Sequence, residues 1–177
     1  EVDLNDKGDG KYTFIMPSGK ITIDASFRLI PETEVQANPF TDVAESAYYF
    51  DAVLWAVENG ITSGTGDGTT FSPNAACTRA QMATFLWRAA GSPEPTGGAN
   101  PFVDVLTDTY YAKAVQWAYE QGITSGTSTT TFGPDDPCTR GQMATFLWRN
   151  AGSPVPTGDT NPFTDTLAGI YYTSAVQ

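Results

Sequence analysis

Two arginines stand at positions that helix stability does not explain. Arg79 and Arg140 each follow a threonine of the type that begins helices, so each is expected at the first position of a helix. The helix dipole disfavours a cation there by roughly 0.3 to 1 kcal/mol. We therefore predict that each guanidinium holds a carboxylate in a bidentate pair. Two partners stay open, an acidic ligand or the protein's own Asp42 and Asp104.

The composition excludes most other chemistry. The 177 residues include no histidine, which removes the commonest general base, the commonest activator of Ser and Cys nucleophiles, and the commonest metal ligand. The two cysteines cannot build a tetrahedral zinc site without further Cys or His ligands. We therefore expect a protein that is not an enzyme and that uses no metal and no cofactor.

Charge and hydrophobicity narrow the range of partners. The chain has 9 basic and 20 acidic residues, for a net charge of -11, so most of its surface repels nucleic acid and anionic lipid. Its apolar runs fall far short of the roughly 20 residues that cross a bilayer. We expect no nucleic-acid partner and no membrane insertion, and we interpret the chain as a mature fragment of an exported protein.

The chain repeats itself, and the repeat carries both arginines. The sequence NPFTDV at Asn38 returns as NPFVDV at Asn100 and as NPFTDT at Asn161, 62 and then 61 residues later. Long matches keep this register, such as CTRAQMATFLWR at Cys77 and CTRGQMATFLWR at Cys138. The predicted units are repeat 1 (38–99), repeat 2 (100–160) and a truncated repeat 3 (161–177).

Each repeat is predicted to form a helix, a loop and a second helix. The first helix is expected to begin near Ser46 in repeat 1 and Asp108 in repeat 2, and to stop in repeat 1 at Gly60. The second helix is expected to begin at Thr78 and Thr139, where Thr-x-x-Gln is the capping-box pattern. Units of two helices are too small to close a core alone, so neighbouring repeats should pack on one another.

Residues 1–36 differ from the repeats. Alternating apolar residues, Tyr12 with Phe14 and Ile21 with Ile23, flank a Pro-Ser-Gly turn and predict a β-hairpin. The segment resembles the closing strands of short β repeats common in bacterial surface proteins. We predict that it is the end of an upstream β domain.

The repeats resemble the S-layer homology (SLH) family over residues 38–177. The shared motifs, in order, are F-x-D-V, an aromatic residue at helix one, G-I-x-x-G, D-G-T-x-F-x-P and T-R-A-[EQ]. In repeat 1 they are Phe40 to Val43, Tyr49, Gly60 to Gly64, Asp67 to Pro73 and Thr78 to Gln81. The resemblance implies a mainly α fold, with helix-loop-helix repeats of about 61 residues in a pseudo-threefold arrangement beside the N-terminal β-hairpin fragment.

The resemblance also implies a function. Grooves between repeats of this family bind secondary cell-wall polysaccharide, often bearing acidic pyruvyl ketal groups, and so tether exported proteins to the Gram-positive envelope. The expected partner is therefore an acidic, pyruvylated cell-wall glycan, and the expected location is the extracellular cell surface. The groove residues implied here are Arg79, Arg140, Asp42, Asp104, Tyr49, Tyr111, Gly64 and Gly126.

Two further pairs of residues have open interpretations. Trp55 and Trp117 lie slightly off the apolar stripe of the first helix, so each is a candidate either for stacking on a sugar or for the core. Cys77 and Cys138 replace an aliphatic residue of the family pattern. Two small buried hydrophobic side chains or a disulfide, within or between chains, would each fit.

Departures from the family pattern keep a second hypothesis open. Gln81 and Gln142 replace the motif's Glu, Gly141 replaces its Ala, and repeat 3 lacks the T-R-A-E segment. The leading hypothesis is a non-catalytic anchor on a cell-wall glycan. The alternative is a structural self-assembly module, in which another copy or another SLH-bearing chain completes the third repeat and gives fibres or oligomers.

Overall fold

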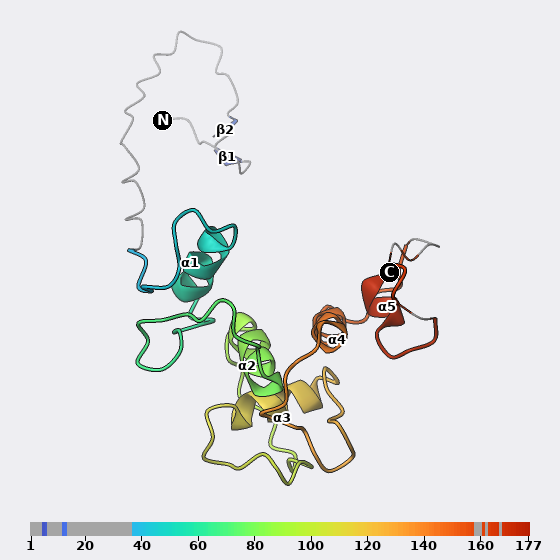
Figure 1. The fold of residues 1–177 in the computed structure, drawn as a ribbon. Coiled ribbons are helices and arrows are strands. Elements are labelled where there is room, and N and C mark those ends of the chain that lie inside the picture. The colour runs from blue at the N-terminus through green and yellow to red at the C-terminus, as the bar shows by residue number, and fades with distance from the viewer. Residues whose placement is uncertain (1–4, 7–11, 14–36, 158–160, 162, 167) are drawn as a thin grey trace, which may run out of the picture. The chain divides into compact units, whose positions relative to one another are not determined.

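The structure, a computed structural model, separates the chain into two compact units, Glu1–Val35 and Gln36–Gln177 (Figure 1). The residues it describes are 5–6, 12–13, 37–157, 161, 163–166 and 168–177.

The described part of the first unit is a short antiparallel pair. Strand β1 (Asn5–Asp6) pairs with β2 (Tyr12–Thr13). The hairpin predicted from the sequence joins different segments, and Phe14, Ile21 and Ile23, on which that prediction depends, lie outside the described residues.

The regular structure described in the second unit is helical, as predicted. Its helices are α1 (Phe50–Glu58), α2 (Arg79–Ala89), α3 (Ala112–Glu120), α4 (Arg140–Asn150) and α5 (Thr173–Val176). Helices α1 and α2 belong to repeat 1, α3 and α4 to repeat 2, and α5 to repeat 3.

The second helix of each complete repeat begins at the predicted capping box. The Thr78 hydroxyl accepts the backbone N–H of Gln81 at 3.2 Å, and the Gln81 side-chain oxygen accepts the Thr78 N–H at 2.8 Å. Thr139 and Gln142 repeat both bonds at 3.2 and 3.0 Å. These contacts fix the first residue of each helix, which is Arg79 or Arg140.

The predicted starts of the first helices are wrong. Neither Ser46 nor Asp108 is an N-cap: α1 begins after Tyr49 and α3 after Tyr111, and neither tyrosine side chain makes a cap hydrogen bond. The preceding residues form turns instead, with the Ala47 N–H bonded to the Ala44 carbonyl at 2.9 Å. Because those turns use the local backbone groups, helical hydrogen bonding starts later than residue type alone indicates.

The predicted stop at Gly60 is confirmed. Gly60 has φ +66°, a conformation that glycine adopts without steric cost. Its N–H bonds to the Val57 carbonyl at 2.9 Å, and the Ile61 N–H bonds to the Ala56 carbonyl at 2.8 Å. This is the Schellman arrangement, and it turns the chain toward the loop that follows α1.

The main core is shared between repeats. Helix α2 of repeat 1 packs on α3 and α4 of repeat 2, and Figure 1 shows α2 next to α3. The buried residues of this core are Ala80, Met82, Ala83, Leu86, Phe102, Val105, Val115, Trp117, Ala118, Ile123, Phe132 and Phe146. The prediction that neighbouring repeats pack on one another is thereby confirmed.

Backbone pairing also joins the two repeats. Thr78, just before α2, forms an antiparallel bridge with Pro137, just before α4. The next residue, Arg79, donates its N–H to the Asp136 carbonyl at 3.0 Å. The start of α2 is therefore held against repeat 2, and the Arg79 side chain enters repeat 2 rather than solvent.

Candidate functional site

Arg79 is the centre of the candidate site. Its side chain is only 3% exposed although it is the first residue of a helix. Its Nε–H donates to the Phe132 carbonyl oxygen at 2.8 Å. Its guanidinium lies over the rings of Phe132 and Phe146, at 4.7 and 5.4 Å from the ring centroids. The two rings and one carbonyl fix where the guanidinium points.

The guanidinium is buried with one nitrogen unsatisfied. Among the residues that the structure describes, Nη2 of Arg79 has no hydrogen-bond partner although it is inaccessible to solvent. Burial lowers the pKa of this guanidinium, and the nearby carboxylates of Asp136 and Asp104 act in the opposite direction. An arginine stays charged in proteins, so a positive donor is kept here without an acceptor. A buried donor without an acceptor lowers the stability of the folded protein, and buried polar groups usually have a hydrogen-bond partner.

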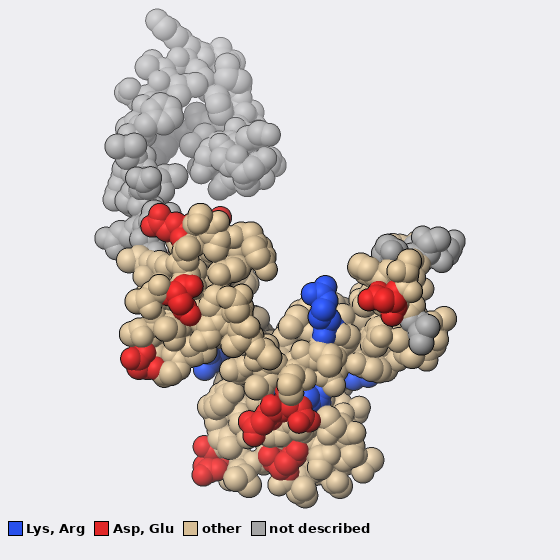
Figure 2. Space-filling model, in the orientation of Figure 1, with Lys and Arg blue, Asp and Glu red and all other residues tan. Residues whose placement is uncertain are grey.

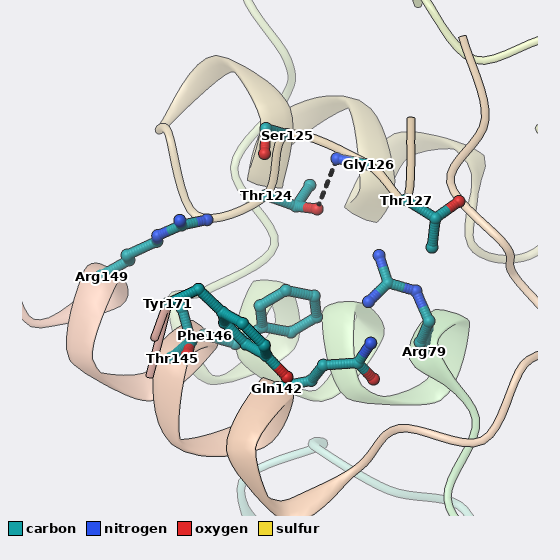
Figure 3. A pocket seen from close by; sticks show the side chains of 10 residues that line it. All are labelled: Arg79, Thr124, Ser125, Gly126, Thr127, Gln142, Thr145, Phe146, Arg149 and Tyr171. Atoms are coloured by element: carbon teal, nitrogen blue, oxygen red, sulfur yellow. Dashed lines mark hydrogen bonds between the residues drawn. The ribbon is translucent and has the colours of Figure 1, made fainter. Parts of the chain in front are cut away.

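A groove of about 310 Å³ is lined in part by Arg79 (Figure 3). Figure 3 shows Arg79 and Tyr171 at opposite sides, with the Phe146 ring between them. The lining residues come from all three repeats. They are Arg79, Thr124, Ser125, Gly126, Thr127, Gln142, Thr145, Phe146, Arg149 and Tyr171.

The charge of the groove is opposite to that of the chain. Among the described residues, its lining has two guanidinium groups, Arg79 and Arg149, and no carboxylate. Figure 2 shows acidic side chains on several parts of this face of the second unit, including its lower middle, and fewer basic ones. An anion is therefore repelled by most of the surface and attracted at this groove.

Gly126 shapes the wall that faces Arg79. Its φ of +84° belongs to the left-handed region, and its N–H donates to the Thr124 hydroxyl at 3.1 Å, the bond dashed in Figure 3. A Cβ at this position would overlap the Thr131 carbonyl oxygen and the Phe102 ring. A glycine is therefore required for this loop to fold closely and present its hydroxyl groups to the groove.

Asp104 positions the acceptor of Arg79 rather than pairing with Arg79. Its carboxylate accepts the N–H of Phe132 at 2.9 Å and the N–H of Gly133 at 2.8 Å. Asp42 does the same in repeat 1, taking the N–H groups of Phe71 and Ser72. Within the part of the chain that the structure describes, neither aspartate forms an ion pair with Arg79. Each aspartate ties the opening of its repeat to the loop before the second helix.

Three other residues expected at the site do not line this groove. Tyr49 and Tyr111 are half-buried and pack on the cores of their repeats. Gly64, with φ +83°, is packed against Phe40 and shapes the loop of repeat 1 as Gly126 shapes that of repeat 2.

Arg140 occupies a different environment from Arg79. It begins α4 as Arg79 begins α2, but its side chain is exposed. Arg79 is covered by the Phe132 loop of repeat 2. The two arginines are therefore equivalent in sequence and unequal in structure.

The two tryptophans proposed for stacking also lie in different environments. Trp117 is 7% exposed and belongs to the core between repeats, which leaves its ring no free face for a sugar. Its position on α3 is buried because α2 packs there. Trp55 is 56% exposed and does not line the groove, so its stacking on a sugar stays a prediction.

The two cysteines lie opposite each other. The Cys138 N–H donates to the Cys77 carbonyl at 2.8 Å, next to the Thr78–Pro137 bridge. Both are free thiols, half-buried against the core, and burial raises the pKa of each. The packing interpretation therefore describes this structure, and a disulfide stays a prediction.

Sequence reasoning missed the residues that complete the groove. Gln142 was interpreted only as a capping residue, and Arg149, in the last turn of α4, was not proposed for the site. The signal for Tyr171 was the Tyr-Tyr pair that occurs in every repeat, at 48–49, 110–111 and 171–172. One aromatic residue is enough to pack a helix start, so the second needed another explanation.

Comparison with known proteins identifies the family. The S-layer homology domain model matches residues 39–83 and 101–144, which is half of the chain. The chain belongs to the S-layer homology domain family, and the matched repeats form a cell-surface anchoring module. The prediction made from the repeated motifs is confirmed.

Several larger proteins contain similar segments. The chain is 36% identical over 118 residues to an endoglucanase of Bacillus sp. (strain KSM-635), which covers 67% of this chain and 12% of that protein. It is 32% identical over 134 residues to the surface-layer 125 kDa protein of Lysinibacillus sphaericus, covering 76% and 11%. A cell surface protein of Thermoanaerobacter kivui is 32% identical over 118 residues, covering 64% and 15%. The matched segment is thus a small part of each relative.

None of the described helices is both long and apolar enough to cross a membrane.

Proposed function

We propose that this chain anchors an exported bacterial protein to an acidic secondary cell-wall polysaccharide, which the Arg79 groove binds. The observation that carries the proposal is Arg79, which lines the groove and whose buried Nη2 has no hydrogen-bond partner among the described residues. A carboxylate on the glycan would supply that acceptor and form a charge-assisted hydrogen bond. A pyruvyl ketal is such a carboxylate.

The groove supports binding rather than catalysis. Its hydroxyl groups come from threonine, serine and tyrosine, and the sequence has no histidine that could activate them. The described lining residues include no carboxylate that could act as a general acid or base. Any catalytic activity of a longer protein would belong to another part of its chain.

The test is co-sedimentation with purified Gram-positive cell walls, before and after the secondary polymer is stripped. Arg79→Gln should weaken binding about tenfold or more, because a hydrogen bond to a charged group is lost. Arg140→Gln is the matched control, with the same substitution at the same helix position but on an exposed residue. Binding that survives Arg79→Gln, or that does not need the polymer, would refute the proposal.

The self-assembly alternative rests on the exposed Arg140, which a repeat from another chain could cover as repeat 2 covers Arg79. Sedimentation velocity at several protein concentrations separates the two functions. A mass that stays monomeric while walls are bound supports the anchor. A mass that rises with concentration and falls in Arg140→Gln supports assembly.

A further inference from the structure

The two cysteines face each other across the boundary between repeats 1 and 2. Thr78 and Pro137 form an antiparallel bridge, and in such a pairing the residue before one partner lies opposite the residue after the other. Cys77 precedes Thr78 and Cys138 follows Pro137, so this register sets the cysteines opposite each other. The Cys138 N–H donates to the Cys77 carbonyl at 2.8 Å, which continues the pairing by one residue.

The spacing of an opposite pair suits a disulfide. Opposite residues in an antiparallel pair have Cα atoms about 4.5 to 5.5 Å apart, and their side chains lie on the same face. A disulfide needs a Cα separation of roughly 4.4 to 6.8 Å. Burial raises the pKa of the Cys77 thiol, and the neighbouring Cys138 raises it further, an effect that requires the two sulfur atoms to be close.

The two thiols have matching surroundings. Each is half-buried against the core that the repeats share. Each donates to the carbonyl of the threonine that follows it, at 3.5 Å from Cys77 and 3.9 Å from Cys138. A thiol is a weak hydrogen-bond donor, so these contacts are readily given up when the sulfur atom bonds elsewhere.

We propose that Cys77 and Cys138 form a disulfide that joins the start of α2 in repeat 1 to the start of α4 in repeat 2. The chain has two cysteines, so this is the one disulfide that a single chain can form. Disulfides persist in proteins outside the cytoplasm, and a cell-surface module belongs to that environment. The bond closes a loop that contains α3 and ties the two repeats together covalently.

The oxidant is a small disulfide such as oxidised glutathione. The two cysteine sulfur atoms are oxidised to one disulfide, and the small disulfide is reduced to two thiols, which take up the two cysteine protons. The Cys138 thiolate first attacks the small disulfide and displaces one small thiolate. The Cys77 thiolate then attacks the Cys138 sulfur of this mixed disulfide and displaces the second.

The order of these steps follows from the charges near each thiol. Burial raises the pKa of the Cys138 thiol, and the Arg79 guanidinium acts in the opposite direction. The neighbour of Cys77 is instead the other thiol, which raises its pKa further. A nearby cation favours the thiolate, and the thiolate is the attacking species, so Cys138 reacts first.

The disulfide strengthens a junction that backbone hydrogen bonds already form. The Arg79 and Ala80 N–H groups donate to the carbonyls of Asp136 and Pro134, both at 3.0 Å. These bonds are lost whenever the repeats separate, whereas a disulfide persists and limits how far the chain can open. The start of α2, which carries Arg79, is thereby kept close to repeat 2.

The first experiment incubates the folded 177-residue chain with oxidised glutathione, alkylates any remaining thiols, and measures the mass. Wild type should lose two hydrogen atoms and carry neither glutathione nor an alkyl group. Cys77→Ser and Cys138→Ser each keep one thiol, so each should stop as an adduct with one glutathione. The adduct should form faster on Cys77→Ser, which retains Cys138.

The second experiment follows thermal unfolding by circular dichroism, with and without reductant. Closing so long a loop should place the midpoint of oxidised wild type about 5 to 15 °C above that of the reduced protein. The double variant Cys77→Ser/Cys138→Ser is the matched control. Whatever its own stability, its midpoint should not respond to reductant.

Three results would overturn the proposal. They are two glutathione adducts on one wild-type chain, two thiols still free for alkylation after oxidation, and a dimer that reductant separates. A midpoint that is unchanged or lower in oxidised wild type would show that the bond does not hold the repeats together. None of these measurements uses a cell wall, so their failure and the failure of the proposed function are told apart.

Discussion

Arg79 and Phe132, 53 residues apart, meet twice: the Arg79 Nε–H donates to the Phe132 carbonyl at 2.8 Å, and its guanidinium lies 4.7 Å from the centroid of the Phe132 ring. Both contacts cross from repeat 1 to repeat 2. They use Nε and one face of the guanidinium, and among the described residues Nη2 has no hydrogen-bond partner. Leaving this buried charged donor without an acceptor therefore lowers the stability of the folded protein.

Gly126→Ala should destabilise the protein strongly. Alanine is strained at φ +84°, and its methyl group would also overlap backbone oxygen atoms of the same loop. We therefore expect the free energy of unfolding to fall by about 3 kcal/mol or more. Gly122→Ala is the matched control, because Gly122 has φ +70° with open space around its Cβ position, and its loss should be about 1 to 2 kcal/mol. Urea unfolding measures both. Equal losses of stability in the two variants would show that close packing around Gly126 adds nothing to the cost of its positive φ.

Acid should weaken the hydrogen bonds by which Asp42 holds the loop before α2 in repeat 1. Hydrogen bonds from the Phe71 and Ser72 N–H groups, that from Phe71 first, hold the pKa of Asp42 below its ordinary 3.8. A lowered folded-state pKa contributes stability above pH 3.8 that is lost as the pH falls through the lower value. Asp42→Asn keeps one acceptor but no charge, so it should be less stable than wild type at neutral pH. Thermal midpoints measured from neutral pH downward should converge in acid, and parallel curves would contradict this role.

Gly141→Ala restores the family's alanine and should nevertheless destabilise the junction of repeats 2 and 3. Its methyl group would lie 2.6 Å from Cδ1 of Tyr172. The gain in helix propensity is at most about 1 kcal/mol, and overpacking costs about 1 to 3 kcal/mol, so a net loss is expected. Displacing Tyr172 would also displace Tyr171, so wall binding should fall.

The control for this change is Ala80→Gly, at the equivalent helix position of repeat 1. Ala80 is 1% exposed in the core, and its loss should cost about 1 kcal/mol or more in urea unfolding. A Gly141→Ala protein more stable than wild type would show that Tyr172 moves aside without cost.

The features predicted correctly depend on hydrogen bonds between near neighbours in the sequence. The capping boxes at Thr78 and Thr139 span three residues, and the stop at Gly60 needs only the last turn of α1. Arg79 and Arg140 were both singled out for the same reason, because the poor fit of an arginine to a helix start is a local property. The start of α1 was missed because the turn at Ala44–Ala47 competes with helix formation, and residue types do not show which wins.

The groove itself could not be assembled from the sequence. Asp104 was a reasonable ion-pair partner for Arg79 until its oxygens were found on Phe132 and Gly133. Trp117 was a candidate for sugar stacking and is buried instead, because burial depends on how α2 packs across the repeat boundary. Sequence periodicity gives the faces of single helices and does not give the register between repeats.

The origin of the groove lining has a consequence for valency. Arg79 comes from one repeat, the hydroxyl wall from the next, and Tyr171 from the one after. A single repeat would carry only fragments of such a site, whereas each repeat added to an array would complete one more. Sites joined in one chain raise one another's effective concentration. Residence time on a polymeric wall would therefore rise steeply with repeat number, even if the affinity of each single groove is low.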